Sequence, residues 1–184
     1  MSLRHCLLVL PLLLVALSAR ADDVASGPAT GANVPAAKVF DATGPHKDKQ
    51  VDYAADRKDK PTIYLFIQSD KFDRPMNRFM KTLDDQVKKD SEDAYVVAVW
   101  LTDDTDREKE KLPRIQQSVQ YQSTALTIFA GKDGPKGWNV NPDAHLTVVI
   151  ANKGKVAQSI GYRTVNATDV PKVREALRKA LDKK

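Results

Sequence analysis

A strand, a short polar loop and a helix follow one another between residues 60 and 87, and this stretch constrains the fold more than any other. Residues 62–67 are β-branched, aromatic or apolar without alternation, which is typical of a strand covered on both faces. Pro75 suits the first turn of a helix, because its missing N–H has no bond to lose there. This helix is predicted to end near Lys89, because apolar residues recur at helical spacing after Pro75. These residues are Met76, Phe79, Met80, Leu83 and Val87.

The following segments predict α/β architecture. Residues 95–101 form a second continuous apolar run, and two buried strands joined by one helix make a right-handed βαβ unit with a parallel pair. A charged helix is expected from Asp104 or Thr105 to about Tyr121, where Pro113 can kink or divide it. We further predict a strand at 125–130, a glycine-rich turn at 131–137, an antiparallel hairpin at 146–151 and 155–161, and a last helix capped by Thr168 or Asp169.

The N-terminal part separates into two segments before the domain. Residues 1–21 have a basic start, an apolar run and Ala19-Arg20-Ala21, which favours a cleaved secretory signal peptide over the alternative of a retained anchor. Residues 22–36 contain small residues, Gly and Pro without apolar periodicity, so we expect a flexible leader. Residues 37–184 then form one domain, with a short edge strand at 38–41 and weak pairing at 50–53.

Charge and cysteine content limit the function. Removal of residues 1–21 takes away Arg4 and Arg20 and lowers the formal charge from +5 to +3, with lysines scattered over the sequence. We therefore expect no nucleic-acid partner and no stable membrane insertion after signal cleavage. The single cysteine, Cys6, lies in the signal segment, so a mature chain has no thiol for a disulfide, a metal site or catalysis. We expect no cofactor.

The order of elements resembles the thioredoxin-like superfamily over roughly residues 37–183, in its extracytoplasmic thiol–disulfide oxidoreductase and peroxiredoxin-type branches. Phe72-Asp73-Arg74-Pro75-Met76 stands where the family has Trp-Cys-Gly-Pro-Cys, so Asp73 and Met76 replace its cysteines. In a peroxiredoxin alignment, Arg74 would instead replace the peroxidatic cysteine. His145 falls where the family has a cis-proline. The resemblance implies a three-layer sandwich, with a central mixed β-sheet flanked by helices.

The same resemblance implies a groove that holds an extended substrate chain. Here the groove would be lined by residues from the degenerate motif and the later loop, namely Phe72, Asp73, Arg74, Pro75, Met76, Ala144 and His145. Because thiol chemistry needs a thiolate, we expect a secreted or periplasmic, redox-inactive module that binds a protein or an extended peptide. The alternative is that these are ordinary loop residues of a degenerate scaffold.

Three other hypotheses remain open. Thioether and imidazole groups suit Cu(I), so Met76, Met80 and His145 are candidates for a site like that of Sco-type copper chaperones, although methionines at this spacing usually pack in a core. A cysteine-free enzyme could use Asp70, Asp73 or Asp103 near the strand ends, without any recognisable catalytic spacing. The chain could also belong to a thioredoxin or peroxiredoxin-type oxidoreductase family by fold only.

Overall fold

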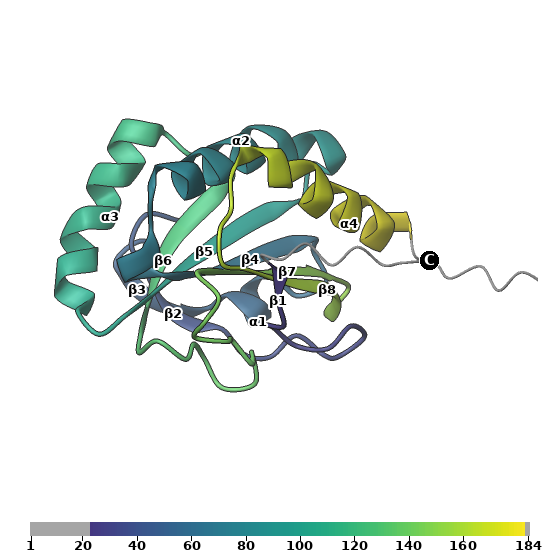
Figure 1. Cartoon of the computed structure of the whole chain (residues 1–184), viewed down its shortest axis with the longest axis horizontal. Coiled ribbons are helices and arrows are strands. Elements are labelled where there is room, and N and C mark those ends of the chain that lie inside the picture. The colour runs from purple at the N-terminus through teal and green to yellow at the C-terminus, as the bar shows by residue number, and fades with distance from the viewer. Residues whose placement is uncertain (1–22, 183–184) are drawn as a thin grey trace, which may run out of the picture.

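The computed structural model describes residues 23–182, and the predicted signal peptide at 1–21 lies outside them. Eight strands form one mixed sheet in the order β1-β8-β7-β4-β5-β6-β2-β3 (Figure 1). The strands are β1 (Asp23–Val24), β2 (Lys38–Asp41), β3 (Lys49–Asp52), β4 (Thr62–Gln68), β5 (Tyr95–Thr102), β6 (Thr124–Ala130), β7 (Leu146–Asn152) and β8 (Lys155–Tyr162). The α-helices are α1 (Tyr53–Arg57), α2 (Arg74–Asp90), α3 (Thr105–Val119) and α4 (Val170–Asp182), and the 3-10 helices are η1 (Ser69–Lys71) and η2 (Ala167–Asp169).

Strand β4 is central, as the sequence predicts. It pairs in parallel with β5 and antiparallel with β7, and β5 continues in parallel with β6. All seven residues of β4 are buried. Ile63, Leu65 and Ile67 contribute to the core on one face of the sheet, whereas Tyr64 and Phe66 contribute to the core on the other. The absence of alternation in this strand therefore reflects burial on both faces.

The two faces of the sheet are covered differently. Helices α2 and α4 lie side by side over one face, where α3 also contributes Leu112 to the core (Figure 1). The opposite face is covered by α1 and by the loop between β6 and β7. In that loop Trp138 places its ring 4.7 Å from the rings of both Tyr64 and Phe66, and its Nε1–H donates to the Ala36 carbonyl at 2.9 Å. The architecture is the predicted mixed α/β sheet flanked by helices.

Residues 23–36 differ from the flexible leader expected from the sequence. Strand β1 pairs antiparallel with β8, and the Gly31 N–H donates to the Val156 carbonyl at 2.7 Å. The Val156 N–H in turn donates to the Ala32 carbonyl at 2.9 Å. These bonds join backbone groups to backbone groups, so a segment without apolar periodicity can still be held along the sheet. Small residues allow this close approach, since a Cβ on Gly161 would collide with the Val24 carbonyl oxygen.

The region between residues 38 and 57 corrects two further expectations. Strand β2 lies between β3 and β6, so it is not an edge strand. The expected pairing at 50–53 is β3 at Lys49–Asp52, and Tyr53 begins the short helix α1 that the sequence pattern does not reveal. Asp52 caps this helix by accepting from the Ala54 N–H, and the buried Tyr53 hydroxyl donates to Asp41 at 2.8 Å. Contacts from outside the segment therefore decide its structure.

The C-terminal half follows the prediction closely. Helix α3 continues through Pro113 rather than dividing there, and β7 and β8 form the expected hairpin. The last helix is entered through η2, which Asn166 caps instead of Thr168 or Asp169. The Asn166 side chain accepts from the Thr168 N–H, and the Asp169 carboxylate accepts from the Asn166 N–H. Between residues 23 and 182, no helix has the length and apolar character needed to cross a membrane.

Candidate functional site

The start of α2 is closed by the side chain that precedes it. Asp73 is the N-cap residue, and its carboxylate accepts from the Met76 N–H at 2.9 Å. Pro75 has no N–H, and the Asn77 N–H donates to the Asp73 carbonyl at 3.0 Å. The positive end of the helix dipole and the exposed N–H groups would otherwise attract an anion. At this helix, the carboxylate of Asp73 already occupies that position.

A pocket of about 330 Å³ lies beside this helix start. It brings together four of the residues predicted from the sequence, namely Asp73, Pro75, Met76 and His145. It is also lined by five residues that the sequence analysis does not identify, namely Lys71, Arg163, Thr164, Val165 and Asn166. Met76 and Val165 are buried, whereas Lys71 and Arg163 are exposed. The pocket therefore combines an apolar floor with a polar, basic rim.

The segment 163–166 reaches the pocket because of the β7–β8 hairpin. Leu146 lies opposite Tyr162 in this hairpin, so the residues just outside its open end are neighbours. The His145 N–H donates to the Tyr162 carbonyl at 2.8 Å, and its own carbonyl accepts from the Gln68 N–H at 3.1 Å. The hairpin is visible in the sequence, and its register places residue 163 beside residue 145. This signal could have added the segment to the predicted site.

Three of the predicted groove residues lie away from the pocket. Phe72 packs against Trp100, with ring centroids 5.3 Å apart, and faces a second pocket between α2 and α3. Arg74 is exposed and does not line the pocket, and Ala144 is buried behind His145. The loop from Phe72 to Pro75 thus has a pocket on each side, rather than one continuous groove lined by all seven residues.

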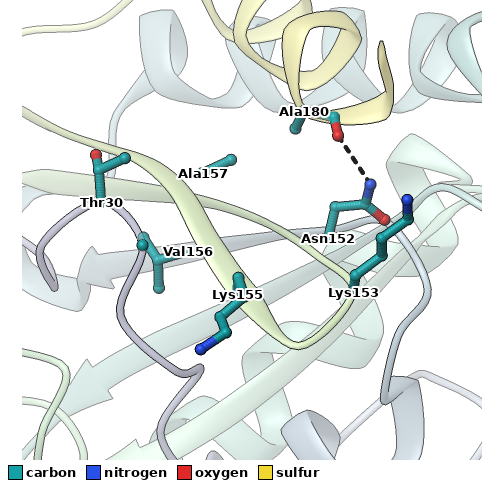
Figure 2. Close-up of a pocket in the computed structure, with 8 residues that line it drawn as sticks. Thr30, Asn152, Lys153, Lys155, Val156, Ala157 and Ala180 are labelled. Carbon is teal, nitrogen blue, oxygen red and sulfur yellow. Dashed lines mark hydrogen bonds between the residues drawn. The ribbon is translucent and has the colours of Figure 1, made fainter. Parts of the chain in front are cut away.

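Other parts of the molecule also have hollows. A pocket of about 240 Å³ lies between the β7–β8 turn, the end of α4 and the N-terminal segment at Thr30 (Figure 2). There the Asn152 side-chain amide donates to the Ala180 carbonyl at 2.9 Å, and the Lys155 amine donates to Asn33 at 2.6 Å. These polar groups hold neighbouring segments together, which indicates a structural role for this corner.

Solved structures resemble this chain over most of its length. A DsbF homologue from Corynebacterium diphtheriae matches with a TM-score of 0.59 and 16% identity, over 86% of this chain and 95% of its own. The peroxidoxin BcpB from Mycobacterium tuberculosis matches with a TM-score of 0.58 and 16% identity, over 83% of this chain and 97% of its own. BsSco, a member of the Sco family of cytochrome c oxidase assembly proteins, matches with a TM-score of 0.54 and 13% identity, over 80% of this chain and 94% of its own.

The chain has the thioredoxin-like fold. No protein-family model and no curated protein matches the sequence. Identities this low establish the architecture and leave the activity to be argued from the site itself. The redox cysteines are absent, because the chain has one cysteine, Cys6, and it lies outside the described residues.

The copper-site candidates of this thioredoxin-like domain do not all meet. Met76 and His145 line the same pocket, but Met80 is 1% exposed and belongs to the core under α2. Its burial fits the usual packing role of a methionine one turn further along an apolar helix face. His46, the other histidine among residues 23–182, lies 3.1 Å from Asp56 near α1. Within those residues, no three His, Cys, Asp or Glu side chains gather as a metal site would require.

The three aspartates considered for acid–base chemistry do not lie at one site, although two of them share a lysine. The Lys132 amine lies between Asp70 and Asp103, 3.7 and 3.8 Å from their carboxylates, at an exposed surface. Asp73 is instead the cap of α2. An ion-paired exposed carboxylate and a helix cap both have ordinary structural explanations, so this arrangement indicates no catalytic pair.

Proposed function

We propose that this protein is an exported thioredoxin-like module that binds an extended segment of another protein without thiol chemistry. Its binding site is the pocket between the start of α2, His145 and the segment 163–166. The observation that carries the proposal is the pocket itself, which joins Asp73, Pro75 and Met76 to His145 at the place of the degenerate redox motif.

The chemistry of the motif position supports the non-redox part of the proposal. Thiol–disulfide exchange and peroxide reduction both begin with attack by a thiolate. Asp73 offers a carboxylate at this position, and its hydrogen bond to the Met76 N–H holds that carboxylate in the role of a helix cap. Met76 offers a thioether that is 2% exposed. Neither side chain can exchange disulfides.

The size and lining of the pocket support a peptide ligand. A volume of about 330 Å³ lies at the lower end of the range for ligand sites and suits one or two amino-acid side chains. Apolar contact with Met76 and Val165 would supply burial, and the rim groups Thr164 and Asn166 would orient the ligand through hydrogen bonds. Export is supported by the signal-peptide pattern of residues 1–21.

The proposal is tested by selecting peptides from a random display library against the full chain carrying Cys6→Ser. Selected peptides are then measured by fluorescence anisotropy. Thr164→Trp fills the pocket at an exposed residue for which the described structure gives no hydrogen bond, and should weaken binding about tenfold or more. Thr30→Trp is the matched control, since it places the same side chain in the pocket of Figure 2.

Two results would count against the proposal. Peptides that bind equally well to the Thr164→Trp variant would place the binding site elsewhere. Catalysed reduction of insulin disulfides or of peroxide by the Cys6→Ser chain would overturn the non-redox assignment, because that chain contains no cysteine.

A further inference from the structure

The rim of the pocket carries two basic side chains that form no ion pair within the described part of the protein. Lys71 and Arg163 line the pocket, and between residues 23 and 182 neither forms an ion pair. Basic residues elsewhere commonly have partners. Lys81 lies 2.7 Å from Asp85, and Arg174 lies 2.6 Å from Asp90. Because Lys71 and Arg163 have no such partner among the described residues, they leave positive charge on the rim of this pocket.

Two acceptor oxygens around the pocket, Asp73 Oδ1 and Asn166 Oδ1, already accept hydrogen bonds. The Asp73 carboxylate accepts from the Met76 N–H. The Asn166 side-chain oxygen accepts from both the N–H and the hydroxyl of Thr168, so the part of this amide that is left for a ligand is its NH₂ donor. The rim thus offers more donors than acceptors. A complementary ligand must supply acceptors and negative charge.

We propose that the pocket selects a peptide carboxylate, an inference that rests on the peptide-binding function proposed above. The apolar stem of a glutamate fits the floor made by Met76 and Val165, and its carboxylate then meets Lys71 and Arg163 at the rim. A guanidinium and an ammonium both form charge-assisted hydrogen bonds to carboxylates. The carboxylate at the end of a peptide chain has the same chemistry, with the last side chain over the apolar floor.

The test uses short fluorescein-labelled peptides of alternating valine and glutamate with both ends blocked. Matched peptides carry glutamine or lysine in place of glutamate, and a fourth peptide is neutral along its length but has a free C-terminal carboxylate. Each is titrated into the Cys6→Ser full chain and into the same chain with Lys71→Glu and Arg163→Glu. Lys89→Glu with Arg107→Glu changes the net charge equally at residues that do not line the pocket.

We expect the glutamate peptide to bind about tenfold more tightly than its glutamine version, because two rim-exposed ion pairs each contribute a modest factor. The Lys71→Glu, Arg163→Glu chain should prefer the lysine peptide, whereas the control pair should keep the original preference. Added salt should reduce the difference in affinity between the glutamate and glutamine peptides, since the charges lie at the surface and are screened. If the neutral peptide with a free C-terminus binds tightly to the original chain and loses that binding in the Lys71→Glu, Arg163→Glu chain, the result would support the inference. The C-terminal carboxylate of the peptide would then be the bound group.

The failures of the two proposals are distinguishable. Equal binding of the glutamate and glutamine peptides, with loss of both in the Thr164→Trp variant, would overturn carboxylate selection and leave the peptide site standing. If no peptide of any charge binds and the display library yields no ligand, both proposals fail.

Discussion

Asp84 provides the sharpest test of how α2 is fixed to the sheet. This carboxylate is 3% exposed on the inner face of the helix and accepts three hydrogen bonds from the entrance of β6. The Gln122 N–H donates to its Oδ2 at 2.9 Å, and the Ser123 N–H and the Thr124 hydroxyl donate to its Oδ1 at 2.8 and 2.7 Å. A single side chain thus joins the helix that carries the candidate site to a central strand.

The substitution Asp84→Asn should destabilise the protein by about 3 kcal/mol. The amide oxygen of asparagine can keep the two bonds made by Oδ1, but each weakens because the acceptor loses its charge. The amide NH₂ then faces the Gln122 N–H. Both groups are hydrogen-bond donors, so the Gln122 N–H loses its acceptor, which lowers the free energy of unfolding by about 1–3 kcal/mol. For a domain of this size, about 3 kcal/mol corresponds to a melting temperature roughly 6–12 °C lower.

Thermal unfolding followed by circular dichroism, together with urea titration, measures the effect. Asp85→Asn is the matched control, because its neighbouring carboxylate is 54% exposed and pairs with Lys81 at the surface. We expect that variant to differ from the wild type by less than about 0.5 kcal/mol. If Asp84→Asn melted within about 2 °C of the wild type, the argument that this buried carboxylate holds α2 to β6 would be refuted.

Three further predictions concern acid stability, the N-terminal segment and the cap of α2. Burial raises the pKa of Asp90, but hydrogen bonds from Arg174 and Arg178 outweigh it and hold the pKa below its ordinary value. Because the folded-state pKa is lowered, the ionised carboxylate stabilises the folded protein at pH values above the unfolded pKa of about 3.9. This contribution to stability is lost as the pH falls through the folded-state pKa. In urea titrations, Asp90→Asn should therefore be less stable than the wild type at pH 7, and the difference in unfolding free energy should shrink as the pH falls below the ordinary aspartate pKa. A difference that does not depend on pH would contradict this. Gly161→Ala should release residues 23–36, because its Cβ collides with the Val24 carbonyl; hydrogen exchange should rise there, and unchanged protection would count against the pairing of β1 with β8. Asp73→Ala should cost about 1 kcal/mol in urea unfolding and Asp73→Asn much less, because asparagine still caps a helix; equal losses would exclude the capping role.

The central part of the fold follows from local sequence patterns. Strands β4 and β5 are recognisable because residues 62–67 and 95–102 are all apolar, aromatic or β-branched, and burial on both faces leaves no room for alternation. The stripe from Met76 to Val87 indicates the buried face of α2 in the same way. Local patterns do not predict an element when its burial or pairing depends on a few contacts with residues far away in the sequence. Trp138 lies in a loop yet covers one face of the sheet, and no periodicity marks it.

The N-terminal segment shows why some elements could not be predicted. Several of the bonds that attach residues 23–36 join backbone to backbone, such as that from the Gly31 N–H to the Val156 carbonyl, and these bonds are independent of side-chain type. Strand β2 gains its inner position by pairing Phe40 with Ile128, across almost half of the chain. A sequence pattern within either segment contains no information about such partners.

For the site, the sequence by itself determined what chemistry is excluded. The resemblance aligns Asp73 and Met76 with the two redox cysteines of thioredoxin-like proteins, and neither side chain can supply a thiolate. The tertiary structure alone decided which residues share the pocket. Closure of the β7–β8 hairpin brings Arg163 and Val165 to His145, while packing against Trp100 turns Phe72 to the other side of the loop. Residue types limit chemistry directly, whereas the composition of a pocket depends on contacts between segments that are distant in the chain.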